Sequence, residues 1–173
     1  MQQVFTSVPK NGKMHKIIFA KDDTHYEQAA ALFNEYAQWL GIDLGFQHFE
    51  QELISLKKVY ATPKGCIILL QDQDKAVGCI ALRPIKDSSG QIGEVKRLYV
   101  QPTHRNQGAA AYLLHTLEAY AIGQRYESLK LDTLGTMLPA MAFYKKHGYQ
   151  ETAPYYHNPI QNAVYFEKEL ASP

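Results

Sequence analysis

The chain has 173 residues, and 18 Lys and Arg residues nearly balance 17 Asp and Glu residues, giving a net charge of +1. This length corresponds to one domain, and the charge balance gives no support to a nucleic-acid-binding protein, which needs a basic face. The longest apolar runs are about five residues, far below the ~18 that span a bilayer. The N-terminal segment lacks the apolar stretch of a secretory signal. These features predict a cytoplasmic enzyme or binding domain of bacterial type.

The first part of the chain predicts a leader, a strand and two helices. Residues 1–15 are interpreted as a loose basic leader, and residues 16–20 as a short strand. Thr24 begins the T-x-x-E spacing of a capping box. The apolar residues that follow recur on one helical face until Gly41, which is the expected end of the first helix. A second helix is predicted over residues 46–56.

The remainder alternates strands with helices. Apolar runs bounded by turn residues predict strands, and two segments with apolar residues at helical spacing predict helices that end at glycine. The predicted strands cover residues 66–70, 76–82, 94–100, 128–133, 149–152 and 163–170, and the predicted helices cover residues 108–122 and 139–147. A polar hairpin at 71–75 joins the first two of these strands, and a loop covers 87–90. Gly123 and Gly148 are the expected helix ends.

This order of elements implies a single α/β domain, of the α+β kind, over residues 16–173. A mixed sheet of about six or seven strands, covered on both faces by about four helices, would bury the apolar side of every element. No internal repeat and no low-complexity linker divides the chain.

The two cysteines, Cys66 and Cys79, each lie inside an apolar run. They are interpreted as buried thiols that act as small hydrophobic side chains. No Cys-x-x-Cys pair and no histidine at ligand spacing accompanies them, and the seven histidines are scattered along the chain. The sequence therefore predicts neither a metal site nor a cysteine nucleophile.

The segment from Arg105 to Ala110 combines a loop, a glycine and the start of a helix. Gly108 has no Cβ, so a ligand can approach the backbone there, and Ala110 is almost as small. The first turn of a helix leaves N–H groups unpaired at the positive end of its dipole. Together with the charge of Arg105, these groups favour a pyrophosphate as ligand. A tight strand-to-helix turn without a ligand is the alternative.

Two motifs between residues 94 and 149 carry a family resemblance. Arg105, Gly108 and Ala110 give the pattern R-x-x-G-x-A after a strand of sequence E-V-K-R-L-Y-V, and a second motif places Tyr144 on a helix that ends in Gly-Tyr. Together they resemble the motifs of the GNAT superfamily of acetyl-CoA-dependent N-acetyltransferases. Stretches such as P-Y-Y-H-N-P are similar to those of a bacterial subgroup. The resemblance implies a mostly antiparallel GNAT sheet, acetyl-CoA as cofactor and direct acetyl transfer to a primary amine.

The resemblance also assigns residues to the cofactor. The strand backbone at Leu98, Tyr99 and Val100 would pair with the pantetheine arm, and the loop and helix start that follow would hold the pyrophosphate. The residues of this loop and helix start are Arg105, Asn106, Gln107, Gly108, Ala109 and Ala110. Asn106 and Ala110 stand where family members often have glycine, and the family's pantetheine-contacting Asn is not evident near the last helix.

Glu94 and Tyr144 are the catalytic residues that the resemblance implies. Glu94 would accept the proton of the acceptor amine, directly or through water; the alternative is a strand-edge glutamate paired with Lys96 or solvent. Tyr144 would donate a hydrogen bond to the CoA sulfur; the alternative is a core aromatic residue. Strand alternation places Glu94, Lys96, Leu98 and Val100 on one face, and Val95, Arg97 and Tyr99 on the other.

Four further residues are candidates for the acceptor pocket. Arg83 and Arg97 interrupt apolar strands, and as substrate ligands they would pair with a carboxylate; ordinary carboxylate-paired arginines are the alternative. Tyr155 and Tyr156 lie in a late loop of the kind that carries specificity.

The sequence thus predicts an acetyl-CoA-dependent N-acetyltransferase that acts on a primary amine of a small molecule. No metal, nucleic acid or membrane is implied, and a homodimer is the habit of the family. Three alternatives stay open: a protein or peptide amine as acceptor, a non-catalytic acyl-CoA-binding or sensor domain, and a nucleotide- or phosphate-binding domain with different chemistry.

Overall fold

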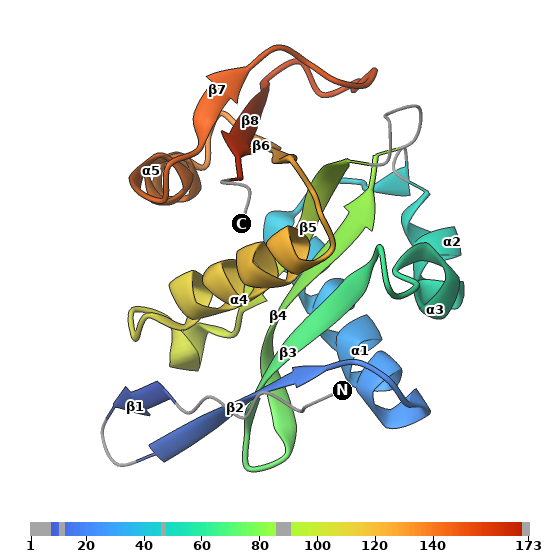
Figure 1. The fold of residues 1–173 in the computed structure, drawn as a ribbon, viewed down its shortest axis with the longest axis vertical. Helices are drawn as coiled ribbons and strands as arrows, with labels where there is room; N and C mark the ends of the chain where they lie inside the picture. The colour runs from blue at the N-terminus through green and yellow to red at the C-terminus, as the bar shows by residue number, and fades with distance from the viewer. Residues whose placement is uncertain (1–7, 11–12, 46–47, 86–90, 171–173) are drawn as a thin grey trace.

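The computed structural model describes residues 8–10, 13–45, 48–85 and 91–170, so the loop predicted at 87–90 lies outside the described residues. Figure 1 shows how the elements of this part follow one another. The strands are β1 (Val8–Lys10), β2 (Lys13–Phe19), β3 (Cys66–Asp72), β4 (Lys75–Pro84), β5 (Ile92–Val100), β6 (Ser128–Leu134), β7 (Gln150–Thr152) and β8 (Ala163–Glu169). The helices are α1 (Asp23–Leu40), α2 (Phe49–Ile54), α3 (Leu56–Val59), the 3₁₀ helix η2 (Pro102–His104), α4 (Ala109–Gly123) and α5 (Leu138–Lys146).

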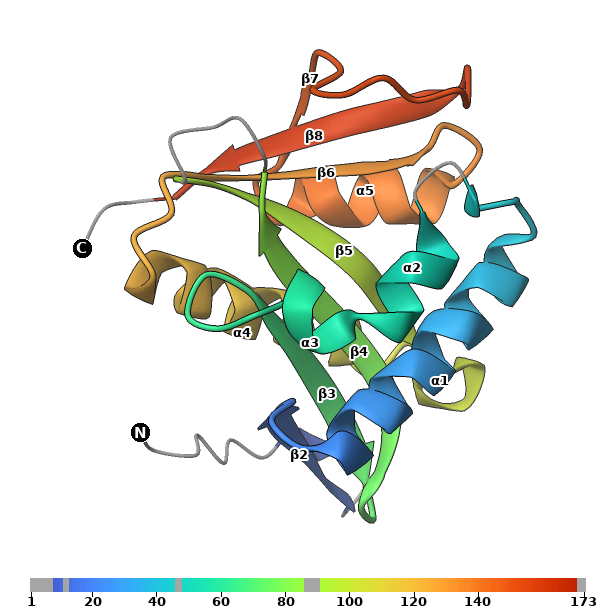
Figure 2. The same cartoon turned by 90° about the vertical axis from the view of Figure 1, so that its right-hand side faces the viewer.

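The strands form one sheet in the order β1-β2-β3-β4-β5-β6-β8-β7. Every neighbouring pair is antiparallel except β5 and β6, which are parallel. Helices α1, α2 and α3 pack on one face, and α4 and α5 pack on the other, as Figures 1 and 2 show from two sides. The predicted mixed, mostly antiparallel sheet with helices on both faces is confirmed.

The sheet has eight strands in the described residues, more than predicted, because β1 and β2 pair near the N-terminus. Val8 pairs with His15, and Lys10 pairs with Lys13, before β2 continues along β3. The ordered strands therefore begin inside the segment predicted to be a loose leader. A strand of three residues is too short to give a readable alternation.

Helix α1 has a suitable cap at each end. The carboxylate of Asp22 accepts a hydrogen bond from the backbone N–H of His25, so the capping box predicted at Thr24 is wrong. Aspartate is among the best N-cap residues because its oxygen satisfies an otherwise unpaired N–H group. Gly41 ends the helix in the left-handed conformation (φ 68°), as predicted.

Other helix ends differ from the prediction. The helix predicted over 46–56 is divided at Ser55 into α2 and α3, and residues 46 and 47 lie outside the described residues. Helix α4 includes Gly123, and the left-handed residue that follows it is Arg125 (φ 63°). None of the helices in the described residues combines the length and apolar content that a membrane-crossing segment requires.

Two hydrophobic cores fill the spaces between the sheet and its helices. Leu113 of α4 and Phe33 of α1 are completely buried on opposite faces of the sheet. Cys66 belongs to the core under α4, and Cys79 belongs to the core under α1. Both thiols are free and buried, as predicted, and burial raises the pKa of each. Neither is placed as an activated nucleophile.

Strands β5 and β6 separate soon after they meet. Ile92–Glu94 of β5 pair with Ser128–Lys130 of β6, and Figure 2 shows the two strands diverging beyond this point. Strand β6 pairs along its whole length with β8, whereas the rest of β5 pairs with β4. One edge of β5, from Val95 to Val100, therefore has no strand partner in the described part of the chain.

Gly65 provides a test of the packing between α3 and β3. A Cβ built on Gly65 would lie 2.7 Å from the carbonyl carbon of Tyr60 and 2.9 Å from its Cα, and backbone atoms cannot rotate away. We expect Gly65→Ala to lower the free energy of unfolding in urea by about 1–3 kcal/mol, the usual effect of overpacking. Gly123→Ala is the control, because a Cβ there meets nothing within 4 Å. Equal stabilities of the two variants would contradict this packing.

Candidate active site

A cavity of about 310 Å³ lies where β5 and β6 separate. Its walls come from α1 and the residues after it, from β5 and β6, from the start of α4, from α5, and from Ile160 between β7 and β8. The lining residues are Tyr36, Trp39, Leu40, Ile42, Leu44, Val95, Lys96, Arg97, Leu98, Tyr99, Val100, Arg105, Ala110, Asp132, Thr133, Leu134, Met137, Pro139, Ala140, Phe143, Tyr144 and Ile160. A mostly apolar lining with a few charged groups, at this volume, is typical of a small-molecule site.

A β-bulge in β5 decides which side chains face which wall. Lys96 pairs with Ala81 and Tyr99 pairs with Cys79, so β5 has one more residue than β4 between the two pairs. The additional residue is Arg97, whose φ of 58° is left-handed. Tyr99 therefore lies on the same face as Lys96, and the alternation predicted for β5 is wrong beyond Lys96. In the structure Glu94, Lys96, Arg97 and Tyr99 face α1 and α2, while Val95, Leu98 and Val100 face α4 and α5.

Arg97 is held by a buried ion pair with Glu52 of α2. Its Nε donates to Oε1 of Glu52 at 3.0 Å and its Nη2 donates to Oε2 at 2.6 Å, and the two side chains are 2% and 3% exposed. The hydroxyl of Tyr60 donates to the same carboxylate at 2.6 Å, and the guanidinium lies near the rings of Tyr36 and Phe49. Burial by itself raises the pKa of Glu52, but the hydrogen bond and charge of Arg97 outweigh it and keep that pKa below its ordinary value.

The loop before α4 presents the start of a long helix next to the cavity. Gly108 is the N-cap (φ 80°), and no side chain in the described part of the chain caps the first N–H groups. A Cβ built on Gly108 would meet nothing within 4 Å, so the space beside the loop is open. Asn106 is also left-handed (φ 60°), a conformation that Asn adopts more readily than most residues. The unpaired N–H groups at the positive end of the helix suit an anion such as a pyrophosphate.

Arg105 lies in a fixed position at the rim of the cavity. Its Nε donates to the carbonyl oxygen of Val100 at 2.8 Å. Its guanidinium lies 4.8 Å from the ring centre of Trp39 and 5.6 Å from that of Tyr99, which are cation–π contacts. These contacts join the loop to β5 and α1 and hold a positive charge beside the helix start.

Tyr144 reaches the cavity from α5. Its side chain is 9% exposed, and its ring packs against the rings of Phe143, Tyr149 and Phe166. Burial raises the pKa of Tyr144 well above its ordinary value, and nearby acidic groups raise it further. Tyr144 is therefore neutral at physiological pH, and its hydroxyl is able to donate a hydrogen bond to a ligand in the cavity.

Glu94 is buried close to the point where the two strands separate. Its Oε2 accepts from Nε of Arg83 at 2.6 Å, its Oε1 accepts from the hydroxyl of Tyr155 at 3.1 Å, and Nζ of Lys96 lies 3.6 Å from Oε1. Burial by itself raises the pKa of Glu94, but the charges of Lys96 and Arg83 outweigh it and hold that pKa below its ordinary value. Glu94 is therefore ionised at neutral pH.

Asp132 of β6 is the carboxylate that lines the cavity. Nζ of Lys96 lies 3.4 Å from its Oδ1, and the hydroxyl of Tyr156 donates to its Oδ2 at 3.0 Å. Asn158 donates in turn to the Tyr156 hydroxyl at 2.9 Å. Burial raises the pKa of Tyr155 and of Tyr156, and the neighbouring carboxylates raise both further. Both tyrosines therefore stay protonated and act as donors.

The structure brings the predicted site residues into one region. Those that line the cavity are Arg97, Leu98, Tyr99, Val100, Arg105, Ala110 and Tyr144. Asn106, Gln107, Gly108 and Ala109 complete the loop and first turn beside it. Arg83, Glu94, Tyr155 and Tyr156 form the polar network behind it.

Three residues of the site were not identified from the sequence. Asp132 lies on the predicted strand 128–133, where strand alternation carries no sign that its carboxylate would line a cavity. Trp39 lies on the first predicted helix, outside its apolar face, and Glu52 lies on the second predicted helix. Helical spacing alone carries no signal that these two would meet Arg105 and Arg97.

The chain is similar to acetyltransferases in sequence and in fold. Residues 14–149 match the family described as the acetyltransferase (GNAT) family. An uncharacterized N-acetyltransferase of Schizosaccharomyces pombe is 40% identical over 143 residues, covering 81% of this chain and 85% of that protein. One of Dictyostelium discoideum is 28% identical over 200 residues, covering 82% and 93%. A GNAT-family acetyltransferase from Staphylococcus aureus has the same fold, with a TM-score of 0.75 at 18% identity over 91% of this chain and 99% of that one. The two sequence relatives are eukaryotic, so these matches do not assign the chain to a bacterial subgroup.

Glu52→Gln tests whether the ion pair holds the bulge in place. The amide keeps the shape of the side chain but leaves the charge of Arg97 buried without an anion. We expect the free energy of unfolding to fall by about 3–5 kcal/mol, the range for breaking a buried pair. The control is Glu151→Gln, which removes an exposed pair with Lys145 (2.6 Å) and should cost less than about 1 kcal/mol.

The pH dependence of the folding stability is a second test of the Arg97–Glu52 ion pair. Because folding lowers the pKa of Glu52, its contribution is complete above the unfolded-state pKa and is lost as pH falls through the folded-state pKa. The stability difference between wild type and Glu52→Gln should therefore shrink as the pH is lowered below about 4. A difference that stays constant through acid pH would contradict an ionised Glu52.

Proposed function

The chain belongs to the GNAT acetyltransferase family and is therefore an acyl-CoA-dependent N-acetyltransferase, and from this premise we propose that it transfers the acetyl group of acetyl-CoA to a primary amine of a small molecule. The observation that carries the proposal is a single cavity that meets three features. These are a strand edge that has no partner in the described residues, an open helix N-terminus and a buried neutral tyrosine.

Two elements of the cavity suit the two parts of CoA. The edge of β5 over Leu98, Tyr99 and Val100 offers backbone donors and acceptors to the amides of the pantetheine arm, in the manner of an added strand. The loop from Arg105 to Ala110 offers helix N–H groups and a positive charge to the pyrophosphate. The open space beside Gly108 is consistent with this assignment.

Tyr144 is the proposed acid at the leaving group. The amine nitrogen attacks the thioester carbonyl carbon, a C–N bond forms, the C–S bond breaks, and the sulfur takes a proton to give free CoA. The neutral hydroxyl of Tyr144 would donate a hydrogen bond that strengthens as negative charge develops on sulfur. Proton transfer from Tyr144 is late or incomplete, because a thiol is a stronger acid than a phenol.

Glu94 is the proposed base for the acceptor amine. A lysine-type amine with a pKa of ~10.4 costs about 4.6 kcal/mol to deprotonate at pH 7. Glu94 is ionised but does not line the cavity, so we expect it to take the proton through water. The carboxylate of Asp132, at the cavity wall, would attract the ammonium form of the acceptor into the cavity.

The wall formed by α1 and the residues after it indicates the kind of acceptor. Trp39 and Ile42 are among the apolar side chains there, and Asp132 is a carboxylate of the same cavity. Such a lining favours a small amine that also carries an apolar portion, because each part then meets a matching surface.

Of the two arginines predicted to meet a substrate carboxylate, Arg83 is better placed. The guanidinium of Arg97 is buried against Glu52, whereas Arg83 is 30% exposed although it also pairs with Glu94. We propose Arg83, with Tyr155 and Tyr156, as the residues that orient the acceptor.

Release of free thiol from acetyl-CoA, measured across a panel of small amines, amino acids and peptides, tests this function. Turnover with at least one small amine is the expected result. Turnover with peptides alone would assign a protein or peptide acceptor, and CoA binding without thiol release would assign a sensor domain. CoA should also stabilise the chain by about 2.7 kcal/mol at 100-fold its Kd, and stronger stabilisation by ATP or NAD would overturn the proposal.

Tyr144→Phe removes the proposed hydrogen-bond donor alone. We expect kcat to fall about 10- to 1000-fold, while acetyl-CoA affinity stays within a few-fold and the melting temperature hardly changes. Tyr149→Phe is the matched control, because it removes a neighbouring buried hydroxyl that does not line the cavity. If the Tyr144→Phe enzyme folds and keeps the wild-type kcat under conditions where chemistry limits the rate, Tyr144 contributes to packing and not to catalysis.

Glu94→Gln keeps the size of the side chain and removes its charge. For an acceptor with a pKa near 10, we expect the rate near pH 7 to fall about 100-fold or more. The loss should shrink as pH rises, since free amine is then already present. Asp132→Asn identifies the responsible carboxylate: a normal rate in Glu94→Gln together with a loss in Asp132→Asn would assign the base to Asp132.

A further inference from the structure

Three possible metal ligands from distant parts of the sequence meet at one end of the sheet. His15 lies on β2, Asp72 ends β3, and His104 ends the 3₁₀ helix η2. One ring nitrogen of each histidine and one carboxylate oxygen of Asp72 all lie within 4.8 Å of one another. Pairing of β2 with β3 brings the first two together, and a hydrogen bond from the N–H of Gln101 to the carbonyl of Val77 holds the start of η2 against β4.

The ring of His15 has a buried nitrogen that needs a partner. His15 is only 8% exposed, and its Nε2 has no hydrogen-bond partner among the described residues. The ring packs edge-on against that of His104, with 5.6 Å between ring centres. Because an unsatisfied buried polar atom is costly and uncommon, it calls for an unseen partner such as an ion.

The other two groups already have the spacing of zinc ligands. Nε2 of His104 lies 3.3 Å from Oδ2 of Asp72. Two atoms that each lie ~2.0–2.1 Å from one tetrahedral zinc ion are about 3.3 Å apart. The His15 nitrogen has to approach by at most about 1.5 Å to complete such a group, a movement within reach of imidazole rotation.

The surroundings of His104 also suit a metal ligand. The hydroxyl oxygen of Thr103 lies 2.9 Å from Nδ1 of His104, the ring nitrogen opposite the one near Asp72. Metal-binding histidines commonly have such a partner at their second nitrogen, which fixes the ring and its tautomer. Two imidazoles and one carboxylate form a donor set that favours Zn²⁺ over Mg²⁺ or Ca²⁺, which prefer oxygen ligands.

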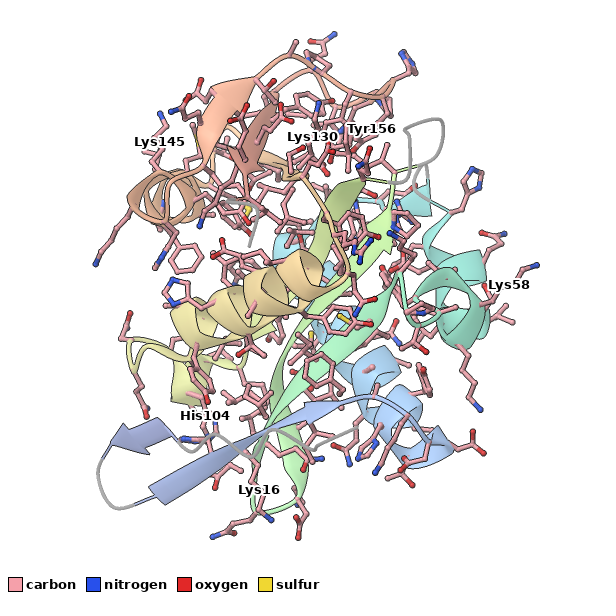
Figure 3. All side chains as sticks on the ribbon, in the orientation of Figure 1. Lys16, Lys58, His104, Lys130, Lys145 and Tyr156 are labelled. Carbon is pink, nitrogen blue, oxygen red and sulfur yellow. The ribbon has the colours of Figure 1, made fainter. Side chains whose placement is uncertain are left out.

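We propose that His15, Asp72 and His104 bind one Zn²⁺ ion. Figure 3 shows His104 beside the β1–β2 hairpin, at the opposite end of the molecule from Tyr156 and Lys130. The ion is therefore outside the region of acetyl transfer. It would tie β2 and β3 to η2, which leads directly into the loop that begins at Arg105, and so brace the N-terminal strands against that loop.

Metal binding by the full-length chain tests the site directly, without any acetyl-transfer assay. The protein is freed of metal with a chelator and titrated with Zn²⁺ by calorimetry, and Co²⁺ absorption reports the coordination. We expect one Zn²⁺ per chain, a rise in melting temperature with Zn²⁺ and none with Mg²⁺. His104→Gln and Asp72→Asn should each weaken Zn²⁺ binding at least tenfold.

The exposed His115–His147 pair provides a matched control. Their ring nitrogens lie 3.1 Å apart on α4 and at the end of α5, so this pair is another place in the described residues where histidines could capture zinc. His115→Gln should leave the affinity and stoichiometry unchanged. Absence of Zn²⁺ binding by wild type, wild-type affinity in folded His104→Gln and Asp72→Asn, or loss of binding in His115→Gln would each overturn the proposal.

Discussion

The cavity where β5 and β6 separate depends on Arg97. This residue has left-handed backbone geometry in the middle of β5, and the buried carboxylate of Glu52 holds it there. A side chain other than glycine at positive φ costs roughly 1–3 kcal/mol, so the conformation persists only where its surroundings enforce it. Two hydrogen bonds from Arg97 to Glu52, with aromatic rings around the guanidinium, supply that enforcement. The bulge lets β5 stay paired with β4 while its other edge leaves β6. The cavity, the unpartnered strand edge and the position of Tyr99 all follow from this arrangement.

Burial and neighbouring charges together set the charge of Tyr144 and of Glu94 in the state that the proposed chemistry needs. Tyr144 is surrounded by rings, which keep it neutral, whereas Glu94 is surrounded by cations, which keep it ionised. These two environments lie on opposite sides of the separated strands, because Tyr144 comes from α5 and Glu94 faces α1 and α2. The neutral hydroxyl of Tyr144 and the ionised carboxylate of Glu94 thus lie apart and do not neutralise one another.

The connection between β5 and α4 is anchored through two adjacent residues, His104 and Arg105. Arg105 binds the carbonyl of Val100 and packs against Trp39, which connects the loop to the opposite layer of the molecule. His104, one residue earlier, lies against Asp72 and the ring of His15. The partners of these two residues come from four separate elements, β5, α1, β3 and β2, so a change in the N-terminal strands reaches the start of α4 through this loop. A zinc ion at His104 would strengthen one of these anchors.

The sequence by itself determined most of the helices and strands, the mixed sheet, the open start of α4 and the tyrosine on α5. Each of these depends on a local signal: the periodicity of apolar residues, the position of a glycine, or a short motif. It did not determine the β1–β2 hairpin, the faces of β5 beyond Lys96, the partner of Arg97 or the cavity-lining role of Asp132. Each of these depends on which distant segments pair. Tertiary structure alone decided them, since one extra residue in a strand reverses every following side chain, and a buried charge finds its partner only when the layers close.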